Sequence, residues 1–255
     1  MSDDKRNFVL VPESQPDAAP APTLLDRLKS LLAPTPLGGL LAAEQEVEPG
    51  ESAPTRPRLV FAFDATASRE PAWETARQVT DALVRALPGE LDVALAVHGG
   101  SRLHTFTEFT ASPRTLRDRA AGITCIPGFT RMLPILSGAL KRAGVRVVVY
   151  IGDVFEESLG QGRKLADAMA ARGMKLIVLH DTSDASARHH AEIFNDLARR
   201  TGGYVLPFDA NAPGKLRELL AALAVFAVGG TALLRQKRSE LPGALVLLEH
   251  LGDRG

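Results

Sequence analysis

The sequence predicts an α/β fold built on a doubly wound, mostly parallel β-sheet with one short antiparallel edge strand. Short apolar runs typical of buried strands alternate along the chain with longer segments whose apolar residues recur at helical spacing. Strands that alternate with helices favour a mostly parallel sheet, because right-handed crossovers place the helices on both of its faces. We therefore expect a Rossmann-like domain, with the connecting loops at the ends of the strands.

The alternating pattern begins at Arg58. Strands are expected at residues 59–63, 91–97, 103–109, 145–151, 175–180 and 204–207. Helices are expected at residues 71–87, 113–121, 132–143, 159–172, 187–201 and 213–228. The Val-Arg-Val-Val-Val-Tyr-Ile run at 145–151 is the clearest strand, and Pro71 suits the start of the first helix. Because Gly99-Gly100 permits a tight turn, the strand at 103–109 is predicted to be the antiparallel edge strand.

The chain divides into three parts by composition. Residues 1–57 hold many of the prolines and predict a flexible arm, within which residues 23–33 form a short amphipathic helix with its leucines on one face. That helix could dock a partner or fold back on its own domain. The α/β domain is expected at 58–229, followed by an apolar, helical extension at 230–255 that could complete the core or mediate self-association.

Composition and charge limit the possible partners. The formal net charge is +0, so no broad basic field favours nucleic acid. Cys125 is the one cysteine, which excludes an internal disulfide and a cysteine-rich zinc site, and we expect a cytoplasmic protein. The uncharged run at 219–234 is shorter than the roughly 20 residues that span a bilayer, so a helix packed on the sheet is expected and no membrane association.

Oxygen-bearing side chains follow two of the expected strands. Asp64-Ala-Thr66-Ala-Ser68 comes directly after the first strand, and Asp153 follows the strand at 145–151. In doubly wound sheets, ligands bind beyond the carboxyl ends of the strands, where the winding direction reverses. If these two strands are neighbours there, both carboxylates meet in one crevice with two hydroxyl groups. Such oxygen ligands suit a hard cation such as Mg²⁺ or Mn²⁺.

These residues and the element order resemble the von Willebrand factor A (vWA) domain family and its metal-ion-dependent adhesion site (MIDAS), over roughly residues 58–228. The family pattern is Asp-x-Ser-x-Ser after the first strand, a threonine in a later loop and an aspartate after the fourth strand. The resemblance implies a metal site formed by Asp64, Thr66, Ser68, Thr130 and Asp153. It also implies a bacterial cytoplasmic domain that uses the metal to bind a partner's carboxylate.

Two positions depart from the family pattern or allow another choice. Thr66 replaces the usual serine, although its hydroxyl can take the same role. Thr124 lies in the same loop as Thr130 and is an alternative ligand, but Gly128 and the helix that follows favour Thr130.

Three functional hypotheses follow from the sequence. The first is a protein-binding module in which the metal accepts an Asp or Glu from a partner protein, with no catalytic residues. The second is a metal-dependent hydrolase acting on a phosphoester, although the chain lacks the second aspartate that haloacid dehalogenase enzymes carry two residues after the first and has Thr66 there. The third is a structural subunit whose metal site has decayed.

Overall fold

The computed structural model describes residues 54–87, 89–185 and 187–251. The expected helix at 23–33 and most of the expected N-terminal arm lie outside these residues.

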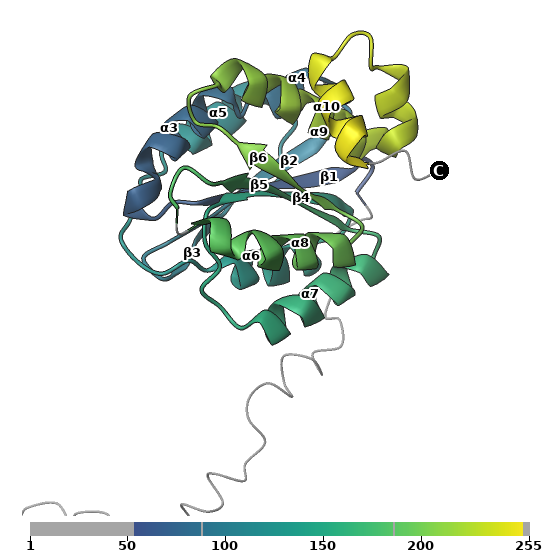
Figure 1. Ribbon diagram of the computed structural model, residues 1–255. Helices are drawn as coiled ribbons and strands as arrows, with labels where there is room; N and C mark the ends of the chain where they lie inside the picture. The colour runs from purple at the N-terminus through teal and green to yellow at the C-terminus, as the bar shows by residue number, and fades with distance from the viewer. Residues whose placement is uncertain (1–53, 88, 186, 252–255) are drawn as a thin grey trace, which may run out of the picture. The chain divides into compact units, whose positions relative to one another are not determined.

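Within the described residues, six strands form a single sheet in the order β3-β2-β1-β4-β5-β6 (Figure 1). Each neighbouring pair is parallel except β2 and β3, which are antiparallel. The predicted fold class, including the antiparallel edge strand, is therefore confirmed. The strands are β1 Arg58–Asp64, β2 Asp92–Gly99, β3 Arg102–Phe106, β4 Val145–Gly152, β5 Lys175–Asp181 and β6 Tyr204–Phe208.

The winding direction of the sheet reverses at β1. This strand pairs with β2 on one side and with β4 on the other, and the chain moves to the second side only after β3. The carboxyl ends of β1 and β4 consequently lie next to each other at one edge. This is the position at which a doubly wound sheet binds its ligands.

Helices cover both faces of the sheet, so the domain has three layers (Figure 1). One layer contains α3, α4, α5, α9 and α10, and the other contains α6, α7 and α8. The helices are η1 Ala67–Arg69, α3 Glu70–Val79, α4 Ala82–Arg85, α5 Pro113–Ala121, α6 Met132–Leu140, α7 Leu159–Ala171, η2 Ala187–His190, α8 Ala191–Arg200, α9 Pro213–Gln236 and α10 Pro242–Leu251.

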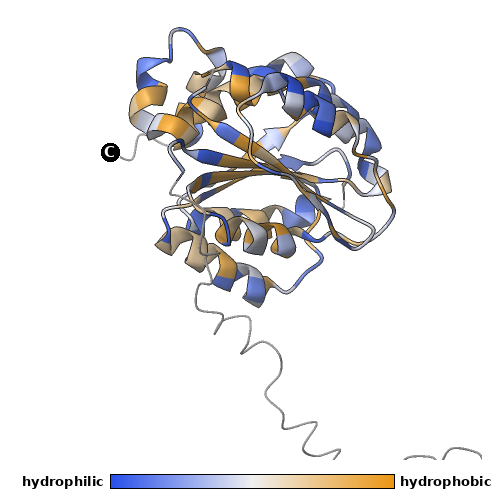
Figure 2. Cartoon of the chain, turned by 180° about the vertical axis from the view of Figure 1, so that it is seen from behind, coloured by the Kyte–Doolittle hydropathy of each residue, from blue (hydrophilic) through white to orange (hydrophobic). Residues whose placement is uncertain are grey.

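Two apolar clusters, one on each face, hold the layers together. In β1, Leu59 and Phe61 belong to the cluster that includes α3 and α9, whereas Val60 and Ala62 belong to the cluster with α6 to α8. Successive side chains of a strand point to opposite faces, so a strand buried on both sides is apolar throughout. Figure 2 shows this as a mostly hydrophobic sheet between helices with polar outer surfaces.

Two helices differ from the prediction. The segment expected as one helix at 71–87 is divided into α3 and α4 at Thr80, whose hydroxyl donates a hydrogen bond to the carbonyl of Arg77. Side chains of this kind compete with the helix backbone. The element α9 is longer than the helix expected at 213–228 and runs to Gln236, but Gly230 has a non-helical conformation (φ 62°, ψ −156°) that kinks it close to the expected end.

The C-terminal part of the described chain packs on the same core. Leu234 of α9 and Leu247 of α10 are fully buried in the cluster that contains Leu59. By length and composition, α9 is the one helix in the described ranges that could cross a membrane, but half of its most apolar window is buried inside the domain. Leu220 and Leu223, near its middle, are fully buried.

Candidate metal centre

Asp64 lies at the centre of the candidate site. It is the last residue of β1 and is fully buried. Its Oδ1 accepts a hydrogen bond from the backbone N–H of Thr66 at 3.0 Å, which turns the chain sharply after the strand. The hydroxyls of Thr66 and Ser68 lie 3.4 Å apart. One short loop thus presents three oxygen-bearing side chains at the edge of the sheet.

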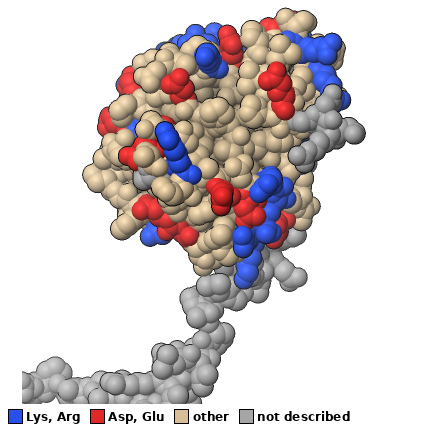
Figure 3. All heavy atoms as spheres, in the orientation of Figure 1, with Lys and Arg blue, Asp and Glu red and all other residues tan. Residues whose placement is uncertain are grey.

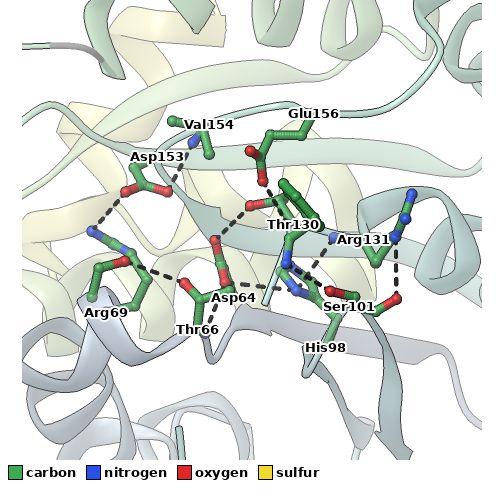
Figure 4. Close-up of polar contacts among 12 residues, drawn as sticks. Asp64, Thr66, Arg69, His98, Ser101, Thr130, Arg131, Asp153, Val154 and Glu156 are labelled. Atoms are coloured by element: carbon green, nitrogen blue, oxygen red, sulfur yellow. Dashed lines mark hydrogen bonds and ion pairs between the residues drawn. The ribbon is translucent and has the colours of Figure 1, made fainter. Parts of the chain in front are cut away.

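Thr130 approaches the same carboxylate from a distant loop. Its hydroxyl donates to Asp64 Oδ2 at 3.2 Å, and its side chain is almost fully buried (Figure 4). Thr124, the alternative ligand in the sequence, is exposed. The structure therefore brings Thr130 to Asp64.

Backbone contacts hold the Thr130 loop in place. Gly128 lies so close to the β2–β3 turn that a Cβ atom there would be 2.4 Å from the backbone nitrogen of Ser101, so only glycine fits. The N–H of Phe129 donates to the Ser101 hydroxyl at 2.9 Å, and the N–H of Thr130 donates to Glu156 Oε2 at 2.8 Å. Hydrogen bonds therefore hold the loop to the β2–β3 turn on one side of β1 and to the segment after β4 on the other side.

The crevice is the space between the carboxyl ends of β1 and β4, and Asp153 directly follows β4 at its side. Its Oδ1 accepts a hydrogen bond from the N–H of Val154 at 2.8 Å. Its Oδ2 lies 3.8 Å from Nη1 of Arg69, which also contacts Asp181 Oδ2 at 2.7 Å. Asp153 does not cap the following helix, because Ser158 accepts the hydrogen bond at the start of α7. Figure 4 shows Asp64, Asp153 and Arg69 near one another at this edge of the sheet.

The two carboxylates of the crevice lie in an unfavourable environment for negative charge. Burial raises the pKa of Asp64, and hydrogen bonds from Thr66 and the charge of Arg69 only partly oppose this effect. Burial also raises the pKa of Asp153, and the negative charge of Asp64 adds to the increase. A buried and a partly buried carboxylate that repel each other are stabilised by a cation placed between them.

The residues fit a hard cation by the chemistry of their donor atoms. Carboxylate and hydroxyl oxygens from Asp64, Thr66, Ser68, Thr130 and Asp153 are the ligand types that Mg²⁺ and Mn²⁺ prefer. Carboxylates and imidazoles alone do not make such a site, since no group of three His, Cys, Asp or Glu side chains gathers as a metal cluster in the part of the chain that the structure describes. The hydroxyl groups are therefore essential to any metal site here.

His98 lies beside Asp64, in the neighbouring strand β2. It is fully buried in β2, and its Nδ1 lies 3.6 Å from Asp64 Oδ1 and accepts the N–H of Arg131 at 3.4 Å. Its Nε2 is 3.0 Å from the hydroxyl of Tyr150. Burial lowers the pKa of His98 to about 4, so this imidazole is neutral at neutral pH.

The loop cysteine, Cys125, is only half-buried, yet burial raises its pKa to about 11, which keeps it an unreactive thiol.

Four charged residues near the site were not singled out from the sequence. Arg69 directly follows the motif, and Asp181 ends β5 just as Asp64 ends β1, so the rule that identified Asp64 could have identified Asp181. Glu156 and Glu157 accept hydrogen bonds from the backbone N–H groups of Thr130 and of Leu133 in α6, each at 2.8 Å.

The class of protein that these features define is an α/β domain with a cluster of oxygen-bearing side chains at the switch point of its sheet. No family model and no curated protein matches the chain. Solved structures do match. A von Willebrand factor type A protein from Catenulispora acidiphila is 14% identical with a TM-score of 0.54, and the match covers 67% of this chain and 43% of that one.

Two further structures share the fold. The SpRpn10 VWA domain is 11% identical with a TM-score of 0.50, covering 63% of this chain and 95% of that one. An aerotolerance-related membrane protein from Bacteroides fragilis NCTC 9343 is 16% identical with a TM-score of 0.51, covering 65% and 98%. The particular fold is therefore that of vWA-type domains, and at these identities the likeness establishes the fold alone.

Proposed function

We propose that this chain is a protein-binding module that depends on a divalent cation, Mg²⁺ or Mn²⁺. The observation that carries the proposal is the contact of Thr130 with Asp64, because it joins two distant segments into one oxygen-lined crevice at the switch point of a vWA-type fold. Asp64, Thr66, Ser68, Thr130 and Asp153 would hold the cation. A bound dication with an open coordination position would accept a carboxylate from a partner protein.

The surface next to the crevice supports recognition of a protein. Phe129 is 62% exposed, although its own N–H is fastened to Ser101, so a large apolar side chain is held in solvent beside Thr130. An exposed aromatic side chain on a backbone held by a hydrogen bond suits the centre of an interface. We infer that the partner segment carries an apolar side chain near its acidic residue.

The formal net charge of +0 supplies no long-range field of one sign for this recognition. Lysine, arginine, aspartate and glutamate side chains are interspersed over the face shown in Figure 3, without a large region of one sign. Selectivity would therefore reside in the crevice and its rim, including Phe129 and Arg131.

Calorimetric titration with MgCl₂ and MnCl₂ tests the metal requirement. Wild type and the control Asp118→Ala, which removes an exposed carboxylate on α5, are expected to bind one dication, and Asp64→Ala to bind none while it remains folded. Binding of a dication by folded Asp64→Ala with the affinity of wild type would contradict the assignment of the site.

A peptide array then tests the carboxylate requirement. Peptides that pair an acidic residue with a neighbouring apolar residue are compared with the same peptides in which Asp or Glu is replaced by Asn or Gln. Retention should require Mg²⁺, disappear in EDTA and disappear in the amide series. Retention that is unchanged in EDTA would contradict a metal-dependent module.

A further inference from the structure

Arg69 places a full positive charge inside the candidate metal centre. Its side chain is only 5% exposed, and its Nη1 is shared between Asp181 Oδ2 at 2.7 Å and Asp153 Oδ2 at 3.8 Å. Its Nε and Nη2 are buried and have no hydrogen-bond partner among the described residues. A buried guanidinium with unsatisfied donors is costly, so its presence requires an explanation beyond stability.

The charges around Arg69 supply that explanation. Three carboxylates, those of Asp64, Asp153 and Asp181, lie near this one guanidinium, and Arg69 acts to lower the pKa of each. Burial acts in the opposite direction on all three. Arg69 therefore does part of what a bound cation would do for the carboxylates of the crevice.

We propose that Arg69 is a built-in counter-cation that competes with the dication for the carboxylates of the crevice and thereby sets the affinity of the site for metal. This inference rests on the proposed function. Asp181 is the anchor in this arrangement, because its short ion pair holds the guanidinium to one side of Asp153. The shared contact with Asp153 is the one that a dication has to weaken.

Opposite effects on metal affinity follow for the two partners of this ion pair. Removing Arg69 leaves three carboxylates without their counter-charge, which favours a dication. Removing the charge of Asp181 releases Arg69 toward Asp153, which disfavours a dication. If Arg69 only stabilised the fold, removing Arg69 and removing the charge of Asp181 would not change the metal affinity in opposite directions.

Calorimetry with MnCl₂ and MgCl₂ on the full chain measures these effects. The variants are R69M, D181N, the double variant R69M/D181N and the control R200M, since Arg200 pairs with Asp167 and Asp196 on the surface. Methionine retains much of the apolar stem of arginine. We expect R69M to lower the Kd by about tenfold or more, given the repulsion between a unit charge and a dication at short range.

The expected Kd values of the remaining variants are given relative to wild type. D181N should raise the Kd by about threefold or more, R69M/D181N should lie between wild type and R69M, and R200M should match wild type. Circular dichroism verifies that each variant is folded. If the orphaned Asp181 unfolds R69M, the comparison of R69M/D181N with D181N isolates the arginine, and tighter binding by the double variant is expected.

The outcomes separate this inference from the proposed function. Equal or weaker binding by folded R69M, or by the double variant relative to D181N, would refute the role of Arg69 while leaving the metal site intact. If wild type gives no detectable heat of metal binding while R69M binds the metal, the result would support the inference and show that Arg69 outcompetes the metal. If none of the five proteins gives a detectable heat of metal binding, the result would refute the proposed function and this inference with it.

Discussion

Acidification should destabilise the folded protein through His98. This imidazole is fully buried, and burial lowers its pKa from 6.5 to about 4 even though Asp153 and Glu156 act to raise it. Below pH 6.5 the unfolded chain takes up a proton at this position, while the folded chain does not do so until about pH 4. The contribution of His98 to stability is therefore complete above 6.5 and is lost as the pH falls toward 4.

The size of the effect follows from the same pKa values. The difference between 6.5 and about 4, at about 1.4 kcal/mol for each pH unit, gives about 3 kcal/mol over the whole range. At pH 5 about 2 kcal/mol of this is already lost. That loss is a large fraction of the stability of an ordinary domain.

Urea denaturation at about pH 7.5, 6 and 5 measures the effect in wild type, His98→Asn and His104→Asn. Asparagine at position 98 keeps an acceptor for the N–H of Arg131 but does not titrate. Between pH 7.5 and 5, wild type should lose about 2 kcal/mol more than His98→Asn. His104, which is exposed in β3, serves as the control, and its variant should follow wild type. Parallel pH profiles for wild type and His98→Asn would refute the reasoning.

Three further predictions concern the crevice. Because burial raises the pKa of Asp64, its charge is unfavourable in the metal-free protein, so Asp64→Asn should raise the melting temperature in EDTA and abolish stabilisation by Mg²⁺. Glu156→Ala should reduce the free energy of unfolding by about 1 kcal/mol, because the N–H of Thr130 loses its acceptor. Gly128→Ala should cost about 1–3 kcal/mol, since its Cβ would meet the backbone of Ser101.

Thermal and urea denaturation check all three predictions. Asp118→Asn and Gly89→Ala are suitable controls: Asp118 is exposed, and a Cβ atom at Gly89 would meet nothing within 4 Å, although its φ of +78° still disfavours alanine. A lower melting temperature for Asp64→Asn in EDTA would contradict the first prediction. A Glu156→Ala variant as stable as wild type would show that solvent replaces the lost acceptor. A Gly128→Ala variant no less stable than Gly89→Ala would show that the two loops separate at little cost.

Local patterns explain why the fold was predictable from the sequence. Strands buried on both faces are apolar throughout, and residues 59–63 of β1 show this clearly. The position of the candidate site followed from topology, because Asp64 and Asp153 each come at the end of a strand near the switch point. The break in the first helix at Thr80 and the course of α9 past Gly230 to Gln236 were not predicted, because neither a threonine nor a glycine by itself specifies whether a helix stops.

The interactions around the crevice were less accessible to sequence reasoning. Arg69 and Asp181 are 112 positions apart, and no local pattern indicates that an arginine pairs with an aspartate at that separation. The role of Glu156 likewise depends on a long-range contact with the Thr130 loop. A residue's type and its place at a strand end can be read from the sequence, whereas its partner on another loop is defined only by the folded chain.

Diffraction at a wavelength that reveals manganese, from crystals grown with MnCl₂, tests the central claim most directly. The anomalous map should show one strong peak bounded by the oxygens of Asp64, Ser68 and Asp153, and the peak should be absent in Asp64→Ala crystals. Saturating Mn²⁺ that leaves this crevice without a peak in wild-type crystals would contradict the account.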